Sequence, residues 1–173
     1  KFDDSNGGIS IMSELRTNRI IPRDGLASGM SGGIIQIVQN FTDTAIETTN
    51  IAAYVDSGLN ATITPTRSDS KIFIMVSQPW RMANASGGQN GGAYRILRGS
   101  TNIDNVQAYL YYHAGSGMST KYNYGVYNRQ ILDSPATTSA VTYKTQHIPY
   151  GTNSTVYSQY AGRSFMTLME VSG

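Results

Sequence analysis

Residues 51–78 have the sequence IAAYVDSGLNATITPTRSDSKIFIMVSQ, and this stretch decides the fold. Apolar and polar residues alternate from Leu59 to Thr64, which predicts a half-buried β-strand. Pro65 ends that strand, because proline cannot donate to a strand ladder. Residues 72–76 are apolar at every position, which predicts a strand covered on both faces. One cover is the domain's own core, and the other is either a second sheet or another copy of the chain.

Short strands recur along the rest of the chain at spacings of about 8–12 residues, which is typical of a sandwich. Asp56-Ser57-Gly58 predicts a tight turn between two strands. The strands that we predict cover residues 34–39, 51–55, 59–64, 71–78, 94–98, 106–112, 124–132, 141–148, 155–160 and 165–171. The strand over residues 155–160 is expected at the edge of a sheet. Long loops are expected over residues 79–92 and 114–123. The fold class is therefore all-β, an antiparallel β-sandwich, of which the jelly roll is one type.

The composition excludes several classes of protein. Charged residues make up 14% of the chain, against roughly 25% in a typical soluble domain. The absence of cysteine excludes disulfides, thiolate metal sites and cysteine catalysis. The net charge is +2 without a run of Lys or Arg, so nucleic acid is not an expected partner. No apolar run approaches the roughly 20 residues of a membrane span, so membrane insertion is not expected.

Residues 1–33 differ from the regular part of the chain, residues 34–173. They contain only short apolar pieces separated by glycine and polar residues, which predicts an extended arm that does not bury itself. Within residues 34–173, the strands at 72–76 and 165–169 carry apolar residues on both faces. Either these strands are central in a monomeric sandwich under a long loop, or copies of the chain cover them in a homo-oligomer.

The titratable residues do not form a recognisable catalytic or metal-binding pattern. His147 lies in a predicted strand, where we expect it to be partly exposed, and no G-x-S-x-G elbow accompanies it. Most aspartates fall at predicted turns, where they cap their own backbone. No paired carboxylates and no group of ligands at metal spacing are present. We therefore expect no enzyme activity, no metal and no cofactor.

Two predicted loops contain the residue types that bind sugars. Aromatic faces stack on sugar rings, while amide, guanidinium and hydroxyl groups hydrogen-bond the hydroxyls. The candidates in residues 79–93 are Trp80, Arg81 and Asn84, and those in residues 111–127 are Tyr111, Tyr112, His113, Lys121, Tyr122 and Tyr124. Structural alternatives remain open: Trp80 could plug the end of the sandwich, and the tyrosines could be cross-strand pairs.

Five segments together resemble a known kind of domain. They are GGIIQIVQ (32–39), AAYVDSGLNATITPTRSDSKIFIMVS (52–77), YRILRGSTNI (94–103), ILDSPATTSAVTYKTQHI (131–148) and FMTLMEV (165–171). In order and spacing they resemble a domain of tail-fibre and virion-appendage proteins of marine phages, especially cyanophages. The resemblance implies a homotrimeric C-terminal fibre domain on the outside of the virion, with residues 1–33 as the end of the shaft or its junction.

The resemblance also implies a function. We expect a structural protein that attaches the phage to its host, with a lipopolysaccharide or another surface glycan as receptor and other tail or capsid proteins as partners. Three weak sites per fibre would act together through avidity. Two alternatives remain: an appendage that only trimerises or caps a fibre, and a surface-glycan esterase or hydrolase.

Overall fold

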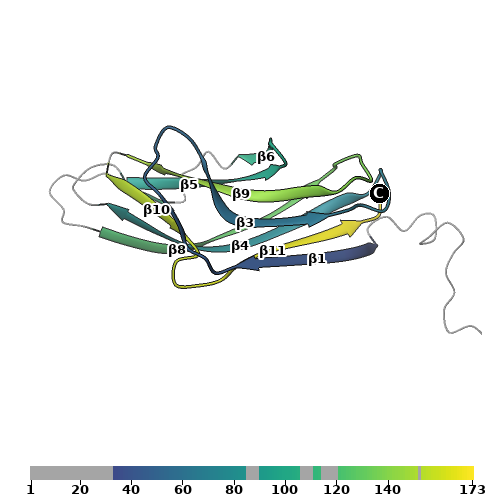
Figure 1. Cartoon of the computed structure of the whole chain (residues 1–173), viewed down its shortest axis with the longest axis horizontal. Coiled ribbons are helices and arrows are strands. Elements are labelled where there is room, and N and C mark those ends of the chain that lie inside the picture. The colour runs from purple at the N-terminus through teal and green to yellow at the C-terminus, as the bar shows by residue number, and fades with distance from the viewer. Residues whose placement is uncertain (1–32, 85–89, 106–110, 114–120, 152) are drawn as a thin grey trace, which may run out of the picture. The chain divides into compact units, whose positions relative to one another are not determined.

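The computed structural model describes residues 33–84, 90–105, 111–113, 121–151 and 153–173. The predicted arm, residues 1–33, lies outside this part except for Gly33. Residues 31–173 form one compact unit, and its described part consists of two antiparallel sheets packed face to face (Figure 1). The prediction of an all-β antiparallel sandwich is therefore confirmed.

The first sheet is arranged around one long strand, β4 (Lys71–Asn84). Its first half pairs with β11 and its second half pairs with β10, while β8 runs along the whole of its other edge. The remaining strands of this sheet are β1 (Ile34–Thr42), β2 (Ile46–Thr48), β8 (Lys121–Asp133), β10 (Ser154–Ser158) and β11 (Ser164–Val171). The second sheet contains β3 (Val55–Ile63), β5 (Asn90–Arg98), β6 (Thr101–Asn105), β7 (Tyr111–His113) and β9 (Val141–Tyr150).

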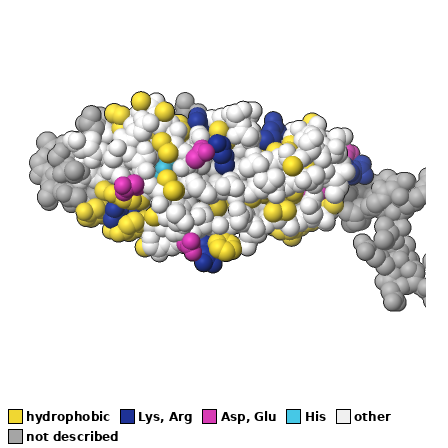
Figure 2. Space-filling model, in the orientation of Figure 1, with side chains coloured by type: hydrophobic (Ala, Val, Ile, Leu, Met, Phe, Trp, Pro, Cys, Tyr) yellow, Lys and Arg dark blue, Asp and Glu magenta, His cyan; other side chains and the backbone are white. Residues whose placement is uncertain are grey.

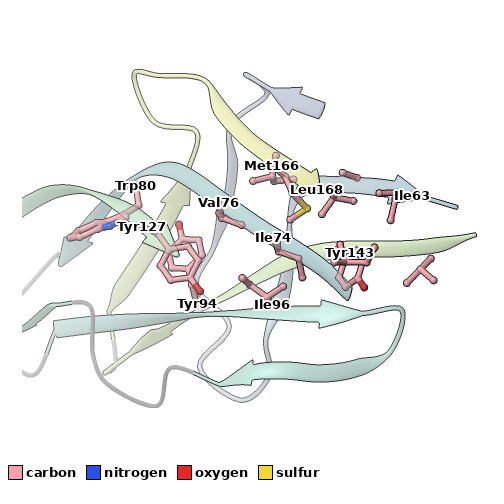
Figure 3. Packing of buried hydrophobic residues seen from close by; sticks show 14 of the residues in the cluster. Ile63, Ile74, Val76, Trp80, Tyr94, Ile96, Tyr127, Tyr143, Met166 and Leu168 are labelled. Atoms are coloured by element: carbon pink, nitrogen blue, oxygen red, sulfur yellow. The ribbon is translucent and has the colours of Figure 1, made fainter. Parts of the chain in front are cut away.

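The two sides of β4 have different surroundings. Ile72, Ile74 and Val76 point between the sheets and are buried, as the alternation of side chains along a strand requires. They join a core that contains Tyr94 and Tyr143 from the second sheet (Figure 3). The intervening side chains of β4 point to the outer side of the first sheet and are only half-buried. The second sheet thus covers one face of β4 and leaves the outer face open.

A polar network ties the sheets together within the core. The Nε2 of Gln78 donates to the Oγ of Ser57 at 2.9 Å, and the Oγ1 of Thr145 donates to the Oε1 of Gln78 at 2.9 Å. All three side chains are buried. Because each has a partner, the network avoids the desolvation cost of an unpaired buried polar group.

The predicted turn at residues 56–58 is wrong. Residues 55–63 form one strand, β3, whose register with β9 shifts between Asp56 and Asn60. Gly58 has a φ of 84°, so the residues that suggested a turn form a β-bulge instead. The bulge directs the Ser57 side chain into the core network.

Other predicted boundaries also changed. The strand that was expected to end at Gln78 continues to Asn84, and the strand that was expected to begin at Tyr124 begins at Lys121. Residues 79–84 and 121–123, which were predicted as loop, are therefore strand. The strand β10 is not at an edge, since it lies between β4 and β2. Most of the strand predicted over residues 106–112 lies outside the described residues.

The described chain begins and ends at the same end of the sandwich. The N–H of Ser172 donates to the carbonyl of Gly33 at 2.9 Å, and the N–H of Gly33 donates to the Oγ of Ser172. Asn84, which pairs with Lys121, lies at the opposite end of β4. At about 3.3 Å per residue, the two ends of β4 are roughly 40 Å apart. Features near Asn84 are therefore remote from the point where the chain enters the domain.

Two neighbouring substitutions on β4 test the assignment of its faces. Val76→Asp should abolish folding or cost several kcal/mol, because it buries an unpaired charge in the core. Ser77→Asp, on the exposed side of the same strand, should change the free energy of unfolding by less than about 1 kcal/mol. Urea denaturation followed by circular dichroism measures both, and equal effects would contradict the assignment.

Candidate binding site

A cluster of tyrosines surrounds Arg81 on the outer face of the first sheet. The Cζ of Arg81 lies 3.9 Å from the ring centroids of both Tyr157 and Tyr160, and 5.1 Å from that of Tyr122. The Tyr124 ring lies 5.7 Å from the Tyr160 ring. We call these five residues the Arg81 cluster. Guanidinium groups are attracted to aromatic faces, so the contacts hold the cluster together.

Strand register explains how the cluster forms. Arg81 on β4 pairs with Tyr124 on β8 and with Tyr157 on β10, so these three side chains share the outer face. Tyr122 lies two residues from Tyr124 and therefore points to the same side. Tyr122 is 53% exposed and Tyr124 is 60% exposed. Their rings are therefore open to a ligand, while Arg81 is partly covered.

An unusual turn positions the fifth residue, Tyr160. The residues on both sides of it, Gln159 and Ala161, have φ values of 58° and 56°. Non-glycine residues in this left-handed region cost on the order of 1 kcal/mol each. The N–H of Gln159 donates to the carbonyl of Pro79 at 2.9 Å and so fixes the turn against β4. The turn follows β10 directly and brings the Tyr160 ring over Arg81.

Two residues predicted to bind a ligand point away from the Arg81 cluster. Trp80 and Asn84 lie on the inner side of β4 and are only 6% and 7% exposed. The Trp80 ring covers Gly125, where a Cβ would lie 2.5 Å from its Cζ2. A glycine is therefore required at that position. Because their side chains are buried, Trp80 and Asn84 are not part of the candidate site.

The structure describes the remaining predicted residues only in part. Tyr111, Tyr112 and His113 form β7, which pairs with the start of β5, and Lys121 begins β8. Their backbones therefore lie at the same end of the sandwich as the Arg81 cluster. Their side chains lie outside the described part of the chain.

The charge of Arg81 has no acidic partner in the described residues. Four other arginines form ion pairs with aspartates, namely Arg67–Asp69, Arg98–Asp133, Arg129–Asp104 and Arg163–Asp43. Burial lowers the pKa of Arg81, but its interactions with Tyr157, Tyr160 and Tyr124 outweigh burial and raise it overall. Arg81 thus stays positively charged among tyrosines.

His147 is buried and not partly exposed as predicted. Its Nδ1 lies 2.6 Å from the Oγ of Ser158, which in turn lies 2.7 Å from the hydroxyl of Tyr94. This chain of contacts links β10 of the first sheet to β5 and β9 of the second. Burial lowers the pKa of His147 to about 4, because the charged imidazolium is poorly solvated there. The network therefore anchors β10, which carries Tyr157, with a neutral histidine.

Comparison with known proteins does not assign the site. No protein-family model matches this chain, and no curated protein is similar to it in sequence. Among the described residues, no three or more His, Asp or Glu side chains are grouped so that they could hold a metal ion. The same part of the chain has no helix that is long and apolar enough to cross a membrane. The arrangement itself, exposed aromatic rings around a cation, is suited to noncovalent binding.

The histidine network predicts a pH dependence of stability. The pKa of His147 is about 4 in the folded protein and about 6.5 when unfolded, so between these values the unfolded chain binds more protons. The free energy of unfolding should therefore fall as the pH drops from 6.5 to 4, by up to about 3 kcal/mol. Urea denaturation across this range measures the change.

A variant separates this effect from that of other groups. His147→Gln removes the titrating ring, so its stability should vary less than that of the wild type between pH 6.5 and 5. Glu170 also has a lowered pKa: burial raises it, but hydrogen bonds from Gln36 and Thr66 prevail. Its contribution is lost only below its ordinary pKa of about 4.5, outside this interval. Identical slopes in the two proteins would show that His147 is not responsible.

Proposed function

We propose that this chain is a homotrimeric phage fibre domain that attaches the virion to surface glycans of its host through the Arg81 cluster. The observation that carries the proposal is the exposure of Tyr122 and Tyr124 beside Arg81. Aromatic faces next to hydrogen-bonding groups are well suited to sugar rings. The sequence resemblance to marine phage tail-fibre domains supports the biological setting.

The position of the Arg81 cluster supports a role at the tip of a fibre. Gly33 and Ser172 meet at one end of the sandwich, and Arg81 lies toward the other end. Both segments predicted to bind a receptor reach that far end, since the end of β4 pairs with the start of β8, and β5 pairs with β7. A shaft that joins near Gly33 would leave the Arg81 cluster facing outward.

The outer face of the first sheet also supports the trimer. A row of apolar side chains crosses four strands: Ile37, Met169, Phe73 and Leu132. With Phe41, Phe165 and Met75, which lie on the same face, they form what we call the apolar patch. The side chains that separate these residues in the register are uncharged, namely Gln39, Thr167, Gln130, Ser77 and Asn128.

The charges that border the patch at Phe41 are those of Arg163 and Asp43, which form an ion pair and so balance each other. The patch can therefore pack against copies of itself with little like-charge repulsion, and obligate interfaces are apolar in this way. This face also contains a pocket of about 430 Å³, lined in part by Met75 and Phe165, so the surface is not flat. Elsewhere charge is sparse, and charged side chains are scattered over the face that Figure 2 shows. The row of the patch nearest to the cluster is that of Phe165, which pairs with Ser77 on β4, four residues or roughly 13 Å from Arg81. Packing through the patch is therefore compatible with an accessible cluster only if the contact between copies does not extend past this row.

The alternative of a purely structural appendage rests on the apolar patch alone. It requires a partner for that surface but gives no reason for exposed tyrosines around an unpaired arginine. A hydrolase that uses His147 finds no support, because the ring has no access to solvent. A trimer that attaches to glycans accounts for both features, since the patch joins the copies and the Arg81 cluster binds the glycan, and we favour it for that reason.

Removal of the exposed tyrosines tests the attachment function. The double variant Tyr122→Ala, Tyr124→Ala should bind at least about tenfold more weakly, because it loses the stacking surface and avidity multiplies the loss. The measurement is binding of the labelled protein to a panel of marine cyanobacterial cells and to their purified lipopolysaccharide. Tyr54→Ala is a matched control, since the Tyr54 ring also lies against an arginine, Arg95, at 4.1 Å, but away from the cluster. Equal binding by wild type and double variant would refute the proposed site.

A charge in the apolar patch tests the trimer. Leu132 is 56% exposed, so Leu132→Glu should leave the fold intact and convert trimers to monomers by placing like charges in the interface. Thr138→Glu, on an exposed loop, should leave the trimer unchanged. Light scattering coupled to gel filtration gives the molecular mass, and a trimer that survives Leu132→Glu would exclude the apolar patch as the interface.

A further inference from the structure

We infer that the ligand of the Arg81 cluster is an acidic glycan, with an anionic oxygen group that accepts hydrogen bonds from the guanidinium of Arg81. The group is either the carboxylate of an acidic sugar or a phosphate of lipopolysaccharide. The inference rests on the proposed function, because it names the class of glycan that the same site would bind.

The first argument is the unbalanced charge of Arg81. Arg67, Arg98, Arg129 and Arg163 each have an aspartate partner, and Arg95 donates two hydrogen bonds to the Oε1 of Gln146. Arg81 has no ion pair within the described residues, although it is partly buried among aromatic rings. Aromatic contacts attract a cation but leave its charge uncompensated, so a bound anion would find a strong partner there.

The second argument is the geometry of the guanidinium. Its Cζ lies 3.9 Å from two tyrosine ring centroids, which restrains the group on β4. Its Nε is buried and has no hydrogen-bond partner among the described atoms. A restrained guanidinium loses little entropy when it binds a carboxylate or phosphate through those of its donors that a ligand can reach.

The third argument concerns the direction of approach. Glu47 on β2 pairs with Tyr157, which itself pairs with Arg81, so Glu47 lies two strands from Arg81, roughly 10 Å. An anion is repelled on that side and favoured on the side of β8. Tyr122 and Tyr124 lie on β8 and are exposed. A sugar ring stacked on either tyrosine could therefore present its anionic group to Arg81.

Chemical treatment of the glycan tests the inference directly. The probe is the lipopolysaccharide that binds the wild-type protein, used in native form, after carboxyl reduction and after dephosphorylation. Binding should fall at least about tenfold after one of these treatments, and the treatment that matters identifies carboxylate or phosphate. Binding to the native form should also weaken as salt increases, because an ion pair at the surface is screened.

Variants of Arg81 complete the test. Arg81→Gln should bind native and treated glycan equally weakly, and Arg81→Lys should retain part of the preference, because it keeps the charge without the planar guanidinium. Arg95→Gln is the matched control, since Arg95 also lies over an aromatic ring, that of Tyr54 at 4.1 Å, but belongs to the second sheet and has Gln146 as its partner. Unfolding midpoints of all three variants show whether the fold is retained.

The outcomes separate this inference from the proposed function. If both treated glycans bind as tightly as the native one, and Arg81→Gln binds like wild type, the acidic-glycan inference is wrong while glycan attachment stands. If the wild-type protein binds no native lipopolysaccharide or cell surface in the panel, the proposed function fails, and the inference fails with it. A preference that persists in Arg81→Gln would place the anion at another residue and would also overturn the inference.

Discussion

The simultaneous pairing of β4 with three other strands is the constraint on which the rest of the structure depends. Its first half meets β11, its second half meets β10, and β8 follows its whole opposite edge. In antiparallel pairs, residues directly opposite each other point to the same side, so the alternation in β4 fixes the faces of all three neighbours. Ile74 and Val76 thereby set the core, and the intervening residues set the outer face.

Pro79 shows why this arrangement is hard to predict. Proline lacks the N–H that a strand ladder needs, yet β4 continues through Pro79 to Asn84. In the structure, β11 pairs with β4 up to Ser77 and β10 pairs from Trp80, so Pro79 lies at the gap between them. The carbonyl of Pro79 accepts a hydrogen bond from the N–H of Gln159 at this gap, and the nitrogen of Pro79 points to the same edge of β4 as its carbonyl. The missing N–H therefore costs no ladder bond, but only the pairing of distant segments reveals this.

The fold class could be predicted because alternation and turn spacing are local properties, whereas the bulge and the site depend on distant contacts. The sequence Asp56-Ser57-Gly58 is compatible with either a tight turn or a β-bulge. The bulge forms because it lets the Ser57 side chain hydrogen-bond Gln78 and Thr145 in the core. Arg81, Tyr122 and Tyr124 were found by residue type, but Tyr157 and Tyr160 were missed, because nothing local indicates that β10 pairs with β4. Treating residues 79–92 as a loop also hid the opposite directions of Trp80 and Arg81.

The outer face of the first sheet divides into two regions with different physical characters, and β4 passes through both. Around Phe73 it is apolar and uncharged, which favours packing against another protein surface. Around Arg81 it is aromatic and cationic, and a turn with two left-handed residues is maintained there at an energetic cost. If copies pack through the apolar patch, the rigid strand between the regions fixes the orientation of each Arg81 cluster relative to the others. Three sites with a fixed orientation bind a repeating polysaccharide more tightly than three independent ones, because less freedom is lost on binding.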